Sequence, residues 1–167
     1  AVLLLFAGGT AILVVARGLN RAASDGGGIV LLDPAPLAEF TLTERSGQRF
    51  HSAELDGTVW VASFFFSACP QRCVKQNLKI QQLARKFGPR GVRFLSITCD
   101  PERDTPYVLA QYADRFAADK HQWLFLTGRF DYIKRIGDDI FQQTVKPQGH
   151  TEYLIVVDQQ GEIRGYF

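Results

Sequence analysis

The 167-residue sequence has no methionine, only three cysteines and almost no excess of charge of either sign. Three cysteines are too few for a disulfide-stapled scaffold, and an odd number leaves at least one thiol unpaired. The 19 basic and 17 acidic residues give a net charge of +2. Nucleic-acid-binding proteins carry a basic stripe, so we expect no nucleic-acid partner. The missing methionine, at position 1 as well, leads us to expect a fragment or a processed product.

Charge is absent altogether from residues 1–16, AVLLLFAGGTAILVVA. This run falls just short of the roughly 20 apolar residues that span a bilayer. We interpret it as a truncated N-terminal transmembrane anchor, rather than as the apolar part of a signal peptide or a buried core helix. Residues 17–38 follow as a linker, because a glycine-rich stretch at 24–28 and a proline-containing stretch at 33–36 are typical of a flexible and then a stiff tether.

From residue 39 to residue 167 the hydrophobic pattern alternates between strands and helices, and 46% of the whole chain is apolar, enough for one domain with a real core. The pattern predicts strands at 59–66, 92–98 and 123–126, helices at 74–87, 105–116 and 131–142, an N-terminal hairpin at 40–43 and 48–50, and a closing hairpin at 153–157 and 163–167. This order favours an α/β sandwich with a mostly parallel central sheet. The last predicted strand reaches residue 167, so we expect the C-terminus to be truncated too.

The motif Cys69-Pro70-Gln71-Arg72-Cys73 stands where the strand at 59–66 passes into the helix at 74–87. We expect Cys69 near the helix N-cap and Pro70 at the first helical position, which places both sulfurs on one face, one turn apart. The helix dipole, its unpaired N–H groups and the Arg72 guanidinium would stabilise thiolates there.

Two such cysteines can cycle through a disulfide, bind a soft metal, or serve only as small buried side chains. Three residues separate them, one more than in the redox pair of thioredoxin-like proteins. A Cys69–Cys73 disulfide remains compatible with this spacing, because neighbours on one helical face can reach bonding distance. The wider gap also allows two thiolates to spread around one metal ion.

His150 directly precedes the closing hairpin. In thioredoxin-like folds the loop before that hairpin faces the cysteine motif, so we expect the imidazole near both sulfurs. Alone, His150 would be a surface or capping histidine. With Cys69 and Cys73 it would complete a soft, low-coordinate set suited to Cu(I) and able to hold Cu(II). Zinc would normally require a fourth protein ligand, and none is evident.

The segment that follows the strand at 92–98 reads Cys99-Asp100-Pro101-Glu102-Arg103-Asp104. The carboxyl ends of strands gather at the ligand-binding edge of such sheets, so Asp100 is a candidate for orienting His150 or the metal loop. A helix-bracing role is its alternative. We expect Asp104 to cap the following helix, and Cys99 to pack as a small buried side chain rather than serve as a spare thiol or ligand.

Three runs, WVASFFFSACPQRC, FLSITCDPERDTP and GHTEYLIVVDQQGEIRGYF, together resemble the Sco/SenC family of membrane-anchored copper proteins. The resemblance covers about residues 40–167 in collinear order. It implies a thioredoxin-like copper-binding domain over residues 39–167, with Cys69, Cys73 and His150 as copper ligands and Asp100 influencing the site.

The same resemblance implies a metallochaperone that helps to assemble the binuclear copper centre of cytochrome c oxidase, by delivering copper or by reducing the cysteines of the subunit that carries it. The domain would lie on the periplasmic, extracytoplasmic side of the membrane, or in the mitochondrial intermembrane space. An oxidising compartment would drive Cys69 and Cys73 to a disulfide unless a thiol reductant or copper prevents it. A thiol–disulfide oxidoreductase and a redox or copper sensor are the alternative functions.

Three positions depart from the family pattern. Relatives commonly carry an acidic residue where this chain has Gln71, a second proline where it has Val74, and an aliphatic residue where it has Cys99. None of the three departures removes an expected ligand.

Overall fold

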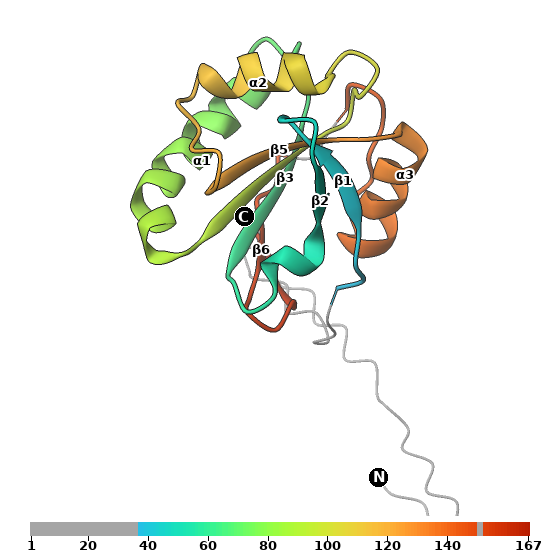
Figure 1. Cartoon of the computed structure of the whole chain (residues 1–167). Coiled ribbons are helices and arrows are strands. Elements are labelled where there is room, and N and C mark those ends of the chain that lie inside the picture. Colours follow the sequence, from blue (N-terminus) through green and yellow to red (C-terminus); the bar gives the residue numbers. More distant parts are fainter. Residues whose placement is uncertain (1–36, 150–151) are drawn as a thin grey trace, which may run out of the picture.

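The computed structural model describes residues 37–149 and 152–167, and within these residues seven strands form one sheet in the order β2-β1-β5-β4-β3-β6-β7 (Figure 1). The strands are β1 (Thr41–Glu44), β2 (Arg49–His51), β3 (Trp60–Phe65), β4 (Arg93–Thr98), β5 (Trp123–Thr127), β6 (Ile155–Val157) and β7 (Ile163–Tyr166). The helices are α1 (Arg72–Phe87), α2 (Pro106–Asp114) and α3 (Phe130–Arg135), the last continued by a π-helical turn at Ile136–Ile140. Every predicted strand and helix is present, with ends shifted by a few residues.

The sheet is mixed, whereas the sequence pattern predicted a mostly parallel one. Only β3–β4 and β4–β5 are parallel pairs among the described strands, and helices α1 and α2 supply the crossovers that parallel neighbours require. The four remaining pairs are antiparallel, since a hairpin flanks the parallel centre on each side. The alternating pattern of the central elements gave no information about how the two hairpins join them.

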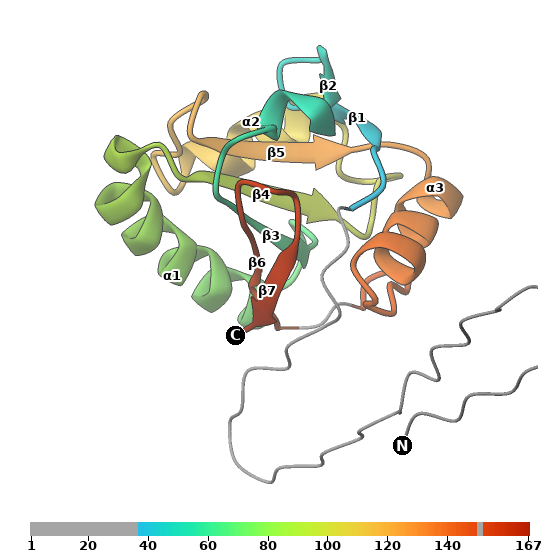
Figure 2. The ribbon, with the colours of Figure 1, turned by 90° about the horizontal axis from the view of Figure 1, so that it is seen from below.

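Helices α1 and α2 cover one face of the sheet and α3 covers the other (Figure 2). Alternate side chains of β3 supply both cores, because successive residues of a strand point to opposite faces. Val61 and Phe65 pack with α1 and α2, and Ala62 and Phe64 pack on the side of α3. All six residues of β3 are buried, as expected for a central strand covered on both faces.

The carboxyl ends of β3 and β4 lie side by side, and the residues that carry the candidate chemistry follow them. Phe65 at the end of β3 pairs with Thr98 at the end of β4. The chain after β3 leads to Cys69, and the chain after β4 leads to Asp100. Parallel pairing therefore brings these two segments to one edge of the sheet.

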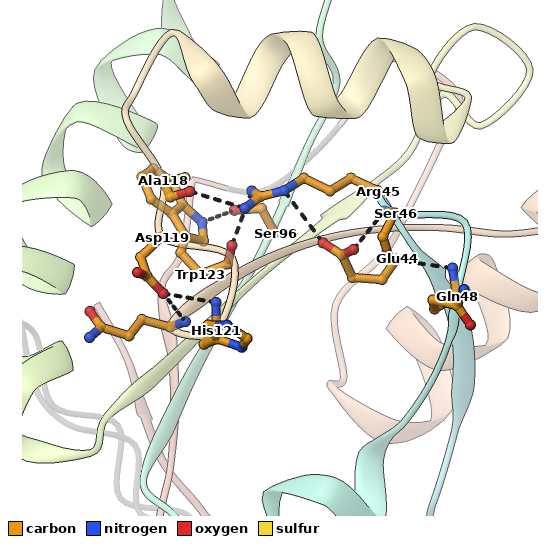
Figure 3. Close-up of polar contacts among 10 residues, drawn as sticks. Glu44, Arg45, Ser46, Gln48, Ser96, Ala118, Asp119, His121 and Trp123 are labelled. Atoms are coloured by element: carbon orange, nitrogen blue, oxygen red, sulfur yellow. Dashed lines mark hydrogen bonds and ion pairs between the residues drawn. The ribbon is translucent and has the colours of Figure 1, made fainter.

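Arg45, in the turn of the N-terminal hairpin, ties that hairpin to the segment around the start of β5 (Figure 3). Its guanidinium donates to the carbonyl oxygen of Ala118 at 3.0 Å and to that of Trp123 at 3.2 Å. It also lies over the ring of Phe125, 5.5 Å from the centroid. The Glu44 carboxylate is 3.6 Å from Nε, and the two charged side chains are only 10% and 12% exposed, so this ion pair is largely inside the protein.

No helix in the described residues is long and apolar enough to cross a membrane. The predicted anchor at 1–16 and nearly all of the predicted linker at 17–38 lie outside the described residues. At the described end of that linker, the Leu37 N–H donates to the carbonyl oxygen of Gly161 at 2.9 Å. The chain thus enters the domain beside the β6–β7 turn.

Candidate functional site

Cys69 and Cys73 lie together at the start of α1, which begins before the predicted helix at 74–87 but after Pro70. A turn in which the Cys69 N–H donates to the Phe66 carbonyl oxygen at 3.2 Å separates β3 from α1. The helix starts at Arg72, so Pro70 is not its first residue. The Cys69 sulfur still accepts the backbone N–H of Cys73, at 3.3 Å, and thereby satisfies a donor of the first helical turn. No disulfide joins any of the three cysteines, all of which lie within the described residues.

The two sulfurs of this pair differ in acidity. Burial raises the pKa of Cys69. Its thiolate is stabilised by the backbone N–H and the thiol of Cys73 and by the N–H groups of Gln71 and Arg72. The net pKa therefore lies below the ordinary 9.0. Cys73 is fully buried. Its burial raises its pKa, the Phe66 backbone offsets part of that effect, and the neighbouring Cys69 raises the pKa further. Cys69 is therefore the more acidic thiol of the pair, and Cys73 is the less acidic one.

Cys99 is buried in the core on the side of α3, across the sheet from the other two cysteines. Its thiol donates to the carbonyl oxygen of Phe65 at 3.1 Å. Burial, with smaller contributions from the charges of Asp104 and Asp100, raises the pKa of Cys99 to about 12. The prediction that Cys99 packs as a small buried side chain is confirmed.

Asp104 organises the loop before the cysteines, a role that the sequence did not reveal. Its fully buried carboxylate accepts the backbone N–H of Ser67 at 3.0 Å, the Ser67 hydroxyl, and the Thr98 hydroxyl at 2.5 Å. The cap of α2 is instead Thr105, whose Oγ1 accepts the N–H of Val108 at 3.4 Å. The prediction that Asp104 caps this helix is wrong. Thr105 caps it, and the buried Asp104 carboxylate instead binds Ser67 in the loop after β3.

Asp100 connects the end of β4 with the segment that leads to the closing hairpin. Its N–H donates to the Thr98 hydroxyl at 3.0 Å, and its carboxylate accepts the side-chain amide of Gln148 at 3.2 Å. Arg103 lies 3.8 Å from the same carboxylate oxygen. Asp100 thus contacts this segment through Gln148, while its predicted role in orienting His150 or a metal loop stays a prediction.

His150 and Thr151 lie outside the described residues, but the residues on both sides of them contact the cysteine edge. Gln148 reaches Asp100, as described above. On the other side, Glu152 forms an ion pair with Arg72 of the cysteine motif at 3.5 Å. Gln148 and Glu152 therefore contact two segments, one after β4 and one after β3, that parallel pairing brings to the same edge of the sheet.

Within residues 37–149 and 152–167, no three His, Cys, Asp or Glu side chains gather as a metal-binding group. What the described residues provide is a pair of thiols, Cys69 and Cys73, at the start of a helix. Such a pair can close to a disulfide, or it can supply two ligands of a soft metal ion.

The sheet and its cysteine pair define a thioredoxin-like dithiol protein, in which the pair follows a central strand and opens the next helix. The SCO1/SenC family model matches residues 33–167, so the chain belongs to the SCO1/SenC family.

Three solved structures resemble this one across most of both chains. A SCO1/SenC family lipoprotein from Bacillus anthracis is 28% identical, with a TM-score of 0.75 over 83% of this chain and 88% of that one. BsSco, a member of the Sco family of cytochrome c oxidase assembly proteins in which a disulfide switch has been identified, is 26% identical, with a TM-score of 0.71 over 80% and 83%. Copper-bound Sco1 from yeast is 27% identical, with a TM-score of 0.68 over 80% of each chain.

Proposed function

We propose that this protein is a copper-binding metallochaperone that helps to assemble the copper centre of cytochrome c oxidase, and that copper is its cargo. The observation that carries the proposal is the position of the Cys69–Cys73 pair at the start of α1, on the fold of a family with a copper-bound member. Two soft sulfur ligands favour Cu(I) over harder cations. The link to the oxidase rests on the family, since BsSco belongs to the oxidase assembly proteins.

The proposed ligands are Cys69, Cys73 and His150. Support for the third ligand comes from its neighbours in the sequence, because Gln148 contacts Asp100 and Glu152 contacts Arg72. An imidazole added to two thiolates would also allow Cu(II) to bind.

Copper binding and release would depend on the protonation of the two thiols. Cys69 provides a thiolate readily, because its pKa is lowered by the N–H groups at the start of α1. Cys73 must first lose its proton, since burial raises its pKa. Metal binding therefore releases a proton, and copper would pass to the partner as its ligands replace these sulfurs one at a time.

The remaining parts of the chain would hold the domain near its target. We infer a membrane anchor at 1–16 and a tether at 17–38, with the copper-binding domain over 39–167 on the extracytoplasmic side. The name lipoprotein given to the Bacillus anthracis structure supports membrane attachment in this family. The partner would be the oxidase subunit that carries the binuclear copper site, and a thiol reductant would keep the cysteine pair reduced.

Copper titration of the reduced protein tests the ligand set. We expect stoichiometric Cu(I) binding by the parent and by Cys99→Ser, the control cysteine on the other face of the sheet. Cys69→Ser and Cys73→Ser should lose this binding, and His150→Ala should weaken it by at least roughly tenfold. Stoichiometric binding that survives the Cys69 and His150 substitutions would overturn the proposed site.

A thiol–disulfide oxidoreductase is the second candidate, and the acidity difference between the two sulfurs favours it. A low-pKa Cys69 beside a high-pKa Cys73 is the arrangement in which one thiolate attacks and the other resolves. His150→Ala separates the two functions. A reductase would keep its rate of reducing a partner disulfide, whereas a copper carrier would lose affinity.

A further inference from the structure

A chain of hydrogen bonds joins the loop before Cys69 to the turn before His150. We call it the loop-bridging relay, and it consists of Ser67, Asp104, Thr98, Asp100 and Gln148. The Thr98 hydroxyl has both roles in it, because it donates to Asp104 at 2.5 Å and accepts the Asp100 N–H at 3.0 Å. The relay thus links two segments that lie far apart in the sequence.

The relay is buried at its centre and exposed to solvent at its outer end. Asp104 and Thr98 are fully buried, Asp100 has a side chain that is 12% exposed, and Gln148 lies on the surface. The outermost contact, from the Gln148 amide to the Asp100 carboxylate, is 3.2 Å long. It can therefore be removed without opening the core.

Gln148 also has an unusual backbone conformation. Its φ is +53°, in the left-handed region that residues other than glycine seldom adopt. It lies inside a tight turn in which the N–H groups of Lys146 and Gly149 each donate to the other residue's carbonyl oxygen, at 3.3 and 3.0 Å. Such a conformation persists only where surrounding contacts hold it, and the bond to Asp100 is one such contact.

We propose that Gln148 is a positioning residue, whose amide on Asp100 sets where the Lys146–Gly149 turn lies relative to the cysteine pair. Gln148 precedes His150 by two residues in the sequence. The consequence for copper rests on the proposed function, because the position of this turn affects copper affinity only if His150 is a ligand.

The substitution Gln148→Ala tests this role, and Gln142→Ala is its matched control. Gln142 is also an exposed glutamine with a φ of +53°, so both substitutions place alanine in the same backbone conformation. We expect Gln148→Ala to lower the Cu(I) affinity by about three- to tenfold, the effect of losing one ordinary solvent-exposed hydrogen bond. Gln142→Ala should bind copper like the parent. An unchanged affinity in Gln148→Ala would overturn the proposal.

Two further measurements separate positioning from other effects. Amide hydrogen exchange in the metal-free protein should be faster at Lys146 and Gly149 in Gln148→Ala than in Gln142→Ala, and equal exchange would overturn the positioning role. The reduction potential of the Cys69–Cys73 disulfide should stay the same in both variants, because the turn does not contribute a thiol. A shift of that potential in Gln148→Ala alone would also contradict the proposal.

The design distinguishes failure of this proposal from failure of the proposed function. If His150→Ala binds copper as tightly as the parent, the ligand set is wrong, and hydrogen exchange alone then decides the role of Gln148. If His150→Ala loses affinity and Gln148→Ala does not, the ligand set stands and the positioning role falls.

Discussion

The sulfurs of Cys69 and Cys73 experience opposite electrostatic environments within one helical turn. N–H groups at the start of α1 lower the pKa of Cys69, whereas burial raises that of Cys73. The difference depends on the backbone as much as on the side chains, because most of the stabilising donors of Cys69 are main-chain N–H groups.

We therefore expect alkylation of the reduced, metal-free protein to occur first at Cys69. The thiolate is the reactive form and its fraction rises as the pH passes the pKa, so a lowered pKa places half-maximal reactivity below pH 9.0. Cys73 and Cys99 should react only at higher pH or after unfolding. Mass spectrometry of iodoacetamide-treated protein across a pH series measures this order, with Cys69→Ser as control. Equal rates at Cys69 and Cys73 would contradict the assignment.

Asp104 carries a testable structural role at the same scale. Asp104→Ala leaves the Ser67 and Thr98 donors without their acceptor, so we expect the free energy of unfolding to fall by about 3 kcal/mol. Urea denaturation measures the change. Asp114→Ala, which removes an exposed carboxylate at the end of α2, is the control and should leave stability unchanged. A loss at Asp104 no larger than in the control would show that its bonds contribute little.

The sequence predicted the position of a residue correctly where its neighbours in the chain determine that position. The cysteine pair was placed at a helix start because strand, turn and helix signals meet there. The role of Asp104 was missed because its partner Ser67 is 37 residues away. Nothing in the local pattern indicates such a contact.

At the scale of elements, the N-terminal hairpin is fastened through Arg45. Arg45→Ala removes two hydrogen bonds to carbonyl oxygens and leaves the Glu44 carboxylate buried without its cation. We expect the free energy of unfolding to decrease by about 3 kcal/mol, and Arg45→Lys to be intermediate because an ammonium lacks the planar fork of donors.

Arg129→Ala is the matched control for this prediction. Arg129 also forms an ion pair, with Asp131, but its side chain is 84% exposed. Solvent-exposed pairs contribute little, so urea denaturation should show no measurable change. An equal loss in the two alanine variants would mean that burial does not set the strength of the Arg45 contacts.

The elements themselves were largely predictable, and their arrangement less so. Hydrophobic periodicity predicted β3, β4 and β5 and both hairpins within a few residues. The helix expected at 131–142 is instead α3, followed by a π-helical turn at Ile136–Ile140. Strand direction was the main error, because the antiparallel junctions β1–β5 and β3–β6 join segments distant in sequence.

At the scale of the whole molecule, copper and a disulfide would compete for the same two sulfurs. We expect Cu(I) at a free concentration of 100 times its dissociation constant to raise the free energy of unfolding of the reduced protein by about 2.7 kcal/mol. A chelator should reverse the gain, and the gain should shrink as the pH falls, because both thiols must lose protons to bind. Urea denaturation with buffered Cu(I) measures it.

The oxidised protein provides the control for this prediction. A Cys69–Cys73 disulfide has no thiolate to offer, so copper should not stabilise it, and neither should copper stabilise Cys69→Ser. Equal stabilisation of the oxidised and reduced forms would place copper elsewhere on the molecule.

The deeper burial of Cys73 than of Cys69 has a consequence for how quickly an added thiol can reduce the oxidised protein. Cys69 is 8% exposed and Cys73 is fully buried, so an incoming thiol can attack only the Cys69 sulfur and must expel Cys73. A sulfur of raised pKa is a slow leaving group. Small thiols would therefore reduce the Cys69–Cys73 disulfide slowly. Access to the Cys69 sulfur would set the lifetime of the oxidised protein.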